Sequence, residues 1–130
     1  MNVERSEHAC MVDQETSTIY VMGGRNRKNS RLSSTEKLNV NDLNRKWEIA
    51  SDLKQGLSEA AAVSSKSKEF IGYLVGGVIN KNGAYIYVPT SKIWGLQRST
   101  MRWIELLKRL ETPRYLHTVV NVDPHEFPCN

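Results

Sequence analysis

The sequence predicts an all-β fold made of two four-stranded antiparallel units and the start of a third. The first observation is a short β-rich segment that ends in two glycines and occurs twice, at Ile19–Gly24 and Ile71–Gly77, with the glycine pairs 53 positions apart. The second is a tryptophan after each copy, with Trp47 and Trp103 separated by 56 positions. A repeat period near 50 residues is typical of folds that assemble one supersecondary unit several times.

A third observation marks where the units begin. The segment Arg5–His8 returns as Arg114–His117, 109 positions later, and the middle copy, Ser58–Ala61, lacks both the Arg and the His. These starts divide the chain into residues 1–57, residues 58–111, and residues 112–130 as the start of a third unit with a tail. Residues 117–122 are expected to form the first strand of that third unit.

Each unit has the same order of elements. Apolar runs of four to six residues, separated by polar turns such as Gln14–Ser17 and Ser64–Lys68, are typical of short strands. The strands expected in the first unit are 8–12, 18–22, 35–40 and 46–50. Those expected in the second unit are 60–63, 70–75, 91–96 and 102–106.

One segment also fits a helix. Trp103, Leu106, Leu107 and Leu110 follow the i, i+3, i+4, i+7 spacing of an amphipathic helix, which Pro113 would end. The repeat favours a strand, because Trp103 corresponds to Trp47, and the surroundings of that residue have no helical pattern.

Composition excludes several classes of protein. The chain has 130 residues, of which 39% are hydrophobic and 25% charged, as expected of one soluble domain. No apolar run approaches the roughly 18 residues of a membrane span. Cys10 and Cys129 lie too far apart to suggest a zinc site or a disulfide framework. We expect a cytoplasmic protein without metal or cofactor that does not bind membranes.

The net charge of +4 is modest and much of it lies in one loop, at Arg25, Arg27, Lys28 and Arg31. A basic loop suits acidic peptides or phosphate. Proteins that bind nucleic acid usually add stacking aromatic residues along a basic face, and none alternate with these residues. The sequence therefore predicts no nucleic-acid partner.

These landmarks resemble the kelch repeat: a diglycine that closes the second strand, a large apolar residue seven positions before a Trp, and an Arg/His start. The corresponding residues are Gly23, Gly24, Val40 and Trp47 in the first copy and Gly76, Gly77, Leu96 and Trp103 in the second. The resemblance covers nearly the whole chain and is strongest to the kelch portion of BTB-kelch proteins. It implies structural roles: the glycines adopt positive φ, and the tryptophans fill the space between blades.

The resemblance also implies a partial β-propeller of about two and a half kelch blades, each of four antiparallel strands. Propellers typically have about 4 to 8 blades, so the ring cannot close within one chain of this length. We expect either a fragment of a longer propeller or a chain that completes its ring with other copies or other chains.

For function, the resemblance implies a protein-protein interaction module, a substrate-recognition or scaffold propeller related to the substrate receptors of cullin-RING ubiquitin ligases. An actin-associated kelch scaffold is the alternative. A galactose-oxidase-like enzyme is disfavoured, because the histidines His8, His117 and His125 form no evident copper site, and no catalytic motif is present. We predict no catalytic residues and no enzyme activity.

Kelch proteins often bind partners through the loops that follow the diglycines and join the blades. Here the candidate residues for binding a protein or an acidic peptide are Arg25, Asn26, Arg27, Lys28, Arg31, Tyr85, Tyr87 and Arg114. Arg25 directly follows the diglycine, and its planar guanidinium can bind a carboxylate through two hydrogen bonds. The alternatives are a solvated basic loop, and tyrosines that extend the third strand of the second unit. Self-association or pairing with further blades also stays open.

Overall fold

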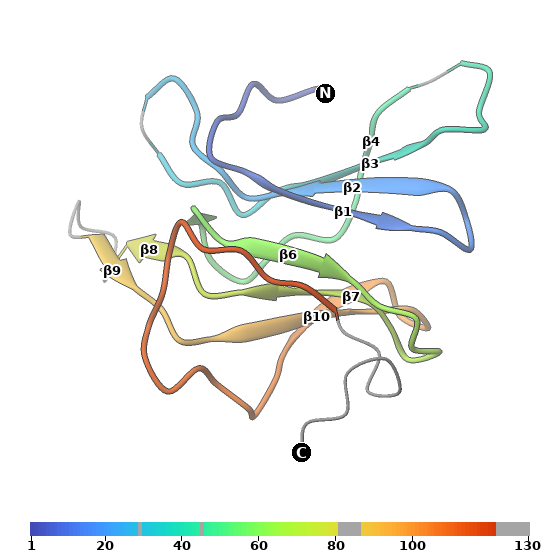
Figure 1. Cartoon of the computed structure of the whole chain (residues 1–130). Coiled ribbons are helices and arrows are strands. Elements are labelled where there is room, and N and C mark those ends of the chain that lie inside the picture. Colours follow the sequence, from blue (N-terminus) through green and yellow to red (C-terminus); the bar gives the residue numbers. More distant parts are fainter. Residues whose placement is uncertain (29, 45, 81–86, 122–130) are drawn as a thin grey trace.

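The prediction of an all-β fold is confirmed. The structure, a computed structural model, describes residues 1–28, 30–44, 46–80 and 87–121, and in these ranges it contains strands and no helix. Two four-stranded antiparallel sheets lie one above the other, with a smaller three-stranded sheet at one end (Figure 1). A helix long and apolar enough to cross a membrane is accordingly absent from the part of the chain that the structure describes.

The first sheet contains β1 (Ala9–Asp13), β2 (Thr18–Met22), β3 (Thr35–Asn39) and β4 (Glu48–Ile49) in the order of the sequence. Buried and exposed residues alternate along β1, as expected of a strand with one face in a core. The strand limits agree with those expected from the sequence to within two residues.

The second sheet repeats this arrangement with β6 (Ala61–Ser64), β7 (Phe70–Val75), β10 (Ile93–Gln97) and β11 (Arg102–Glu105). Its order is β11-β10-β7-β6, so both sheets are meanders in which each strand pairs with the next one of its unit. The two sheets are consistent with blades of a partial propeller.

The helical alternative for the segment that begins at Trp103 is wrong. Trp103 lies in β11, where it pairs with Leu96 of β10, and is only 5% exposed. Leu107, which a helix would have buried on the same face, is wholly exposed. A pairing partner in β10 therefore outweighs the helical spacing of the leucines.

A third sheet has no counterpart among the expected strands. It pairs β5 (Leu57–Ser58) with β8 (Val78–Asn80), and β8 with β9 (Tyr87–Pro89). The hairpin formed by β8 and β9, which follows the second diglycine, thus pairs with β5, the strand where the second unit begins. Because Tyr87 lies in this sheet, the interpretation that it extends β10 is wrong. Tyr85 lies outside the described residues.

The main hydrophobic core lies between the two large sheets. It is contributed by β1 and β2 on one side, by β7, β10 and β11 on the other, and by the connecting segment around Leu53 and Leu57. The indole Nε1 of Trp103 donates a hydrogen bond to Oγ1 of Thr35 in β3, at 3.1 Å. This buried contact joins the second sheet directly to the first, so Trp103 fills the space between them.

Trp47 does not have the same environment. It is only partly buried and is not a member of the core between the sheets. In the register of β3 and β4, Ile49 lies opposite Glu36, which places Ile49 and Trp47 on the face of the first sheet that points away from the second. No sheet among the described residues covers that face, so Trp47 is not packed between two sheets in this structure. Val40, the large apolar residue seven positions before Trp47, lies beyond β3 and is 44% exposed.

The starts of successive units are joined by the same type of backbone hydrogen bond. The amide of Glu59 donates to the carbonyl of Glu7, and the amide of Leu116 donates to the carbonyl of Glu59, both at 3.0 Å. All three residues have positive φ, between 51° and 58°. Glu7, Glu59 and Leu116 therefore hold equivalent positions in the three units. In the middle unit, the residue equivalent to Arg5 is Leu57 and not Ser58.

The first strand expected at 117–122 is not formed. Residues 117–121 are outside any strand, and residue 122 lies beyond the described residues. A strand needs a paired neighbour for its backbone groups. The described residues after Leu116 contain no second strand that could supply one.

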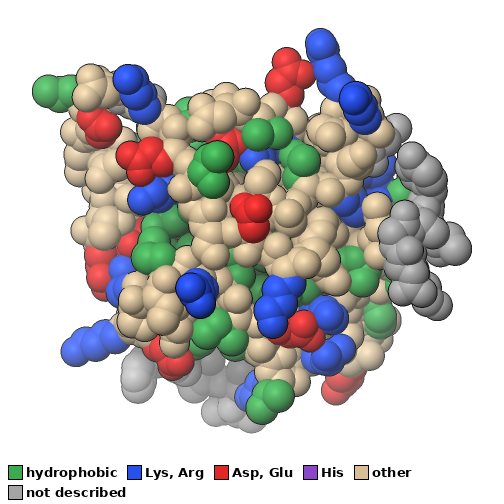
Figure 2. Space-filling model, turned by 180° about the vertical axis from the view of Figure 1, so that it is seen from behind, with side chains coloured by type: hydrophobic (Ala, Val, Ile, Leu, Met, Phe, Trp, Pro, Cys, Tyr) green, Lys and Arg blue, Asp and Glu red, His purple; other side chains and the backbone are tan. Residues whose placement is uncertain are grey.

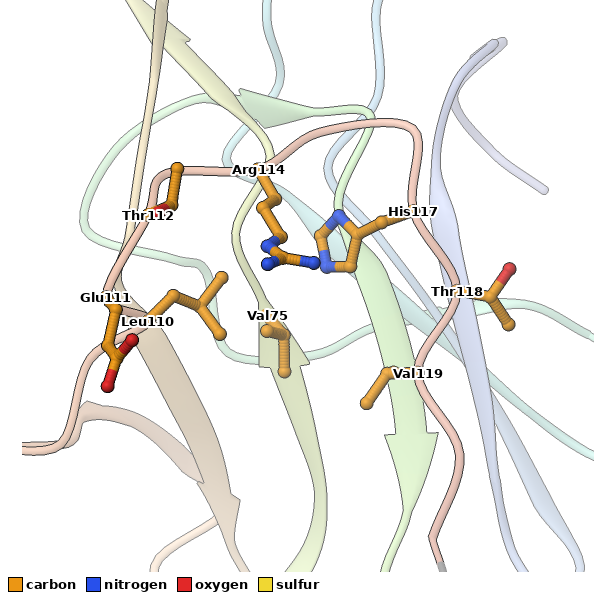
Figure 3. A pocket seen from close by; sticks show the side chains of 8 residues that line it. All are labelled: Val75, Leu110, Glu111, Thr112, Arg114, His117, Thr118 and Val119. Atoms are coloured by element: carbon orange, nitrogen blue, oxygen red, sulfur yellow. The ribbon is translucent and has the colours of Figure 1, made fainter.

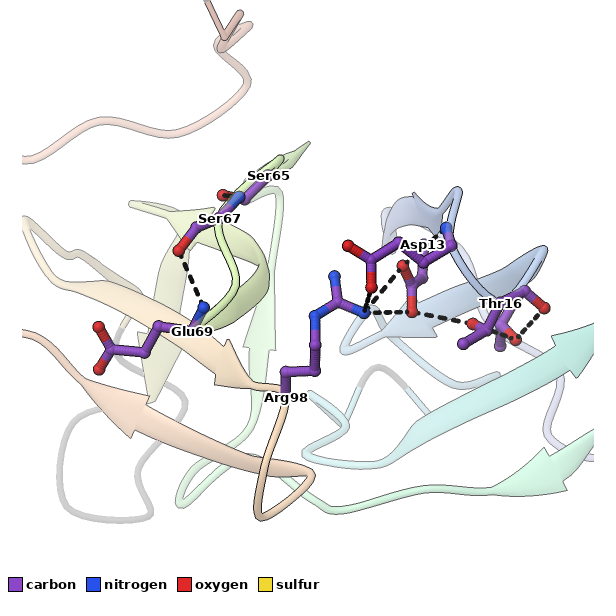
Figure 4. Close-up of polar contacts among 8 residues, drawn as sticks. Asp13, Thr16, Ser65, Ser67, Glu69 and Arg98 are labelled. Atoms are coloured by element: carbon purple, nitrogen blue, oxygen red, sulfur yellow. Dashed lines mark hydrogen bonds and ion pairs between the residues drawn. The ribbon is translucent and has the colours of Figure 1, made fainter.

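An ionic cluster joins the turns that follow β1 and β10 (Figure 4). These turns lie at the end of the sheets opposite the small sheet (Figure 1). Nη1 of Arg98, in the turn after β10, donates to both carboxylate oxygens of Asp13 at 3.2 and 3.0 Å, and Nη1 also lies 3.0 Å from a carboxylate oxygen of Glu15. Asp13 is 3% exposed and also accepts from the hydroxyl of Thr16. The cluster connects residues 85 positions apart.

We expect Arg98→Met to lower the free energy of unfolding by about 1–3 kcal/mol, because it leaves the buried Asp13 carboxylate without its cationic partner. Urea denaturation followed by tryptophan fluorescence measures this change. Arg102→Met, at an exposed position of β11, is the matched control and should cost less than about 0.5 kcal/mol. Equal effects of the two substitutions would show that the cluster adds nothing to stability.

Candidate partner-binding surface

The loops that follow the two diglycines leave the sheets at the same end of the molecule (Figure 1). Gly23 and Gly76 have φ of 64° and 62°, and each is followed by a second glycine with φ above 90°. The second glycine amide of each pair donates to the start of the next unit, Gly24 to the carbonyl of Leu57 and Gly77 to that of Arg114, both at 2.7 Å. The turn at each diglycine thus fixes where the following loop emerges.

The first loop is a hairpin that projects from this end. Arg25 pairs with Arg31 through a β-bridge, and the amide of Asn26 donates to the carbonyl of Ser30. The side-chain oxygen of Asn26 accepts from the amides of Lys28 and Ser30, at 2.9 and 3.0 Å. Asn26 therefore shapes the turn, a use typical of asparagine.

Arg27 and Lys28 lie at the exposed tip of this hairpin. Nε of Arg27 is 3.1 Å from Glu4, but the two side chains are 88% and 75% exposed. Such an exposed pair contributes little to stability and is screened by salt. The positive charges at the tip are therefore accessible to a partner.

Arg25 is already bound to two carboxylates of this chain. Its Nε lies 2.7 Å from Glu7, and its Nη2 lies 2.8 Å from Glu59, which is in the start of the second unit. The side chain is 18% exposed. Arg25 thus joins two units, and a partner's carboxylate would have to compete with both of these glutamates.

Arg31 is 8% exposed and is held in place by neutral groups. Its Nε donates to Oγ of Ser58 at 3.0 Å, and its Nη1 donates to Oδ1 of Asn80 at 2.7 Å. Burial lowers the pKa of Arg31, and the nearby charge of Arg25 lowers it further. The guanidinium is therefore fixed between the small sheet and the first loop.

Tyr87 covers these two arginines. Its ring centroid lies 4.3 Å from the guanidinium carbon of Arg31 and 5.2 Å from that of Arg25, distances at which a cation attracts an aromatic face. The side chain is nevertheless 50% exposed. The fold thus brings Tyr87 against Arg25 and Arg31 of the first loop. We use the name Tyr87 surface for these three residues together with Arg27 and Lys28, which lie at the tip of the same loop.

Arg114 is exposed and lines a separate cavity, together with Val75 and His117 (Figure 3). On the face shown in Figure 2, acidic and basic side chains are interspersed and form no broad field of one sign. Among the described residues, no three His, Cys, Asp or Glu side chains are grouped so that they could hold a metal ion.

Sequence reasoning missed four residues that hold the arginines: Glu7, Ser58, Glu59 and Asn80. A signal for two of them was available, because Glu7 and Glu59 have equivalent positions in their units. Ser58 and Asn80 carry no such signal. They meet Arg31 only through the small sheet, which the repeat pattern does not predict.

Comparison with known protein families agrees with this architecture. Residues 16–54 match the family model of the Kelch motif. The match supports a kelch repeat. It extends over β2, β3 and β4 and includes the first diglycine and Trp47. No match to the chain is found among curated proteins.

A kelch repeat indicates a protein-interaction module of the β-propeller type, and kelch repeats generally act without catalysis. Fold alone does not define a partner, because binding depends on the residues of a particular surface.

Proposed function

We propose that this kelch protein binds a protein partner through the Tyr87 surface, and that the partner contributes an apolar residue against Tyr87 with acidic residues beside it. The observation that supports the proposal is the half-exposed Tyr87 ring stacked on the fixed guanidinium of Arg31. Rigid aromatic side chains backed by neighbours dominate the energetics of protein interfaces.

The charges of the surface suggest the acidic character of the partner. Arg25 and Arg31 are engaged within the chain, so they act as a platform that orients Tyr87. Arg27 and Lys28 lie at the exposed tip and would form the outer contacts with carboxylates. A substrate receptor or a scaffold that recognises an acidic segment would use such a surface.

The test uses a fluorescein-labelled peptide of alternating glutamate and leucine residues, with binding followed by fluorescence anisotropy. Tyr87→Ala should weaken binding by about tenfold or more, because it removes the aromatic anchor. Tyr87→Phe is the matched control and should bind like the wild type, since the ring and its stacking are retained.

Arg27→Ala combined with Lys28→Ala should weaken binding several-fold at low salt. The effect should largely disappear near 0.5 M salt, where exposed charges are screened within about 4–5 Å. A peptide with glutamine in place of glutamate should be insensitive to this double substitution. Unchanged affinity in both the Tyr87→Ala and the double variant would remove the Tyr87 surface as the binding site.

A further inference from the structure

A cavity of about 320 Å³ opens between the second sheet and the chain that follows it. Val75, Leu110 and Val119 form its apolar part, and the side chains of Arg114 and His117 point into it (Figure 3). No residue of this cavity belongs to the Tyr87 surface, so the two are separate features of the molecule.

The first unit shows what an arginine at this position binds. Arg5 precedes Glu7 by two residues, as Arg114 precedes Leu116. Glu7 and Leu116 hold equivalent positions, because the amide of Glu59 donates to the carbonyl of Glu7 as the amide of Leu116 donates to the carbonyl of Glu59. The guanidinium of Arg5 is completely buried and donates to a carboxylate oxygen of Glu36 at 2.7 Å.

Arg114 has no such partner in the part of the chain that the structure describes, where no carboxylate lies within ion-pair distance of it. Glu111 also lines the cavity, but its carboxylate points away from the guanidinium (Figure 3). Arg5 thus has a carboxylate ligand in its own unit, and Arg114 has none among the described residues.

The imidazole of His117 adds a second polar group. Both of its ring nitrogens are buried, and neither has a hydrogen-bond partner among the described residues. Burial lowers the pKa of His117, and the adjacent charge of Arg114 lowers it further. Unpartnered buried nitrogens cost free energy, which a bound acceptor would recover.

The geometry points to a binding site in which the cavity takes a glutamate or aspartate side chain of a protein partner between Arg114 and His117, and His117 takes up a proton when it binds. The carboxylate accepts from the guanidinium of Arg114 and from a ring N–H of His117. Its negative charge offsets that of Arg114, which favours the charged imidazolium. The other ionisable groups that line the cavity are Glu111 and Arg114, and β7 contributes only Val75.

The probe is the capped peptide acetyl-Gly-Glu-Gly-amide, with acetyl-Gly-Gln-Gly-amide as its uncharged counterpart. NMR of the His117 ring carbons reports both binding and titration. We expect the Glu peptide to move the titration of His117 to higher pH and to bind more tightly as the pH falls from about 8 to 6, by up to tenfold per unit. The Gln peptide should do neither.

Single substitutions separate the contributions of Arg114 and His117 to binding. Arg114→Met should weaken binding of the Glu peptide at least tenfold, whereas Arg109→Met, which removes an arginine paired with Glu105 outside the cavity, should have no effect. His117→Gln should retain binding but lose its pH dependence. Retained NMR dispersion and melting temperature show that each variant is folded.

Three results would overturn the proposal: no saturable binding of the Glu peptide, equal binding of the Gln peptide, or wild-type affinity in Arg114→Met. Tyr87→Ala should bind the Glu peptide like the wild type. Failure at this cavity is therefore distinguishable from failure at the Tyr87 surface.

Discussion

Arg5→Met is expected to lower the free energy of unfolding by about 3–5 kcal/mol, because it leaves Glu36 charged and buried without its partner. The two side chains are 0% and 1% exposed. Arg5 also donates to the carbonyls of Gly23 and Ser34, at 2.8 and 2.9 Å. Equilibrium unfolding in urea at neutral pH measures the loss.

The loss should depend on pH. Burial alone raises the pKa of Glu36, but hydrogen bonds from the amides of Asn2 and Val3 and from Arg5 outweigh it, so the pKa lies below its ordinary value. A carboxyl group with a lowered folded-state pKa adds stability above its unfolded-state value, and this stability is lost as the pH falls further. The difference between wild type and Arg5→Met should therefore narrow below about pH 4.

Two controls define the role of the pair. Arg27→Met breaks an exposed ion pair and should cost less than about 0.5 kcal/mol. Arg5→Met combined with Glu36→Leu should recover much of the loss, because two apolar side chains leave no buried charge. An effect of Arg5→Met as small as that of Arg27→Met would contradict the importance of the buried pair.

Gly23→Ala is expected to cost about 2–5 kcal/mol, since two unfavourable effects add. The residue has φ of 64°, which disfavours any side chain, and a Cβ would overlap the carbonyl oxygen of Leu57. Leu57 is 2% exposed and belongs to the core, so its backbone cannot withdraw without loss of packing. The measurement is again the free energy of unfolding in urea.

Gly76→Ala provides an internal comparison. Gly76 has φ of 62°, and a Cβ there would overlap the carbonyl oxygen of Arg114. Arg114 lies in an exposed segment that can shift more readily than the buried Leu57, so Gly76→Ala should cost less than Gly23→Ala. Equal losses, or a tolerated Gly23→Ala, would show that the contact at Leu57 does not constrain the fold.

The candidate site was predictable only in part. Arg25 and Tyr87 were identifiable from their positions in the post-diglycine loops, because the repeat shows where those loops begin. The ion pairs of Arg25 were not identifiable from the sequence, because its partners Glu7 and Glu59 lie 18 and 34 positions away. The contact of Tyr87 with Arg31 depends on the small sheet, whose strands are too short to leave a pattern in the sequence.

The two sets of strands, their meander order and the positions of the diglycine turns follow from the sequence alone. These features depend on local properties: the alternation of apolar residues, polar turns, and glycine where positive φ is required. The repeat adds independent copies of the same local signal, which is why the strand limits agree to within two residues.

The surroundings of equivalent residues were decided only by the tertiary structure. Trp103 and Trp47 have the same position in their repeats, yet only Trp103 is buried against the other sheet. Arg5 finds a carboxylate on its own sheet, and Arg114 instead lines a cavity. Burial and ion pairing depend on which surface covers a residue, and that surface comes from distant parts of the chain, so identical local patterns acquire different energies and different chemistry.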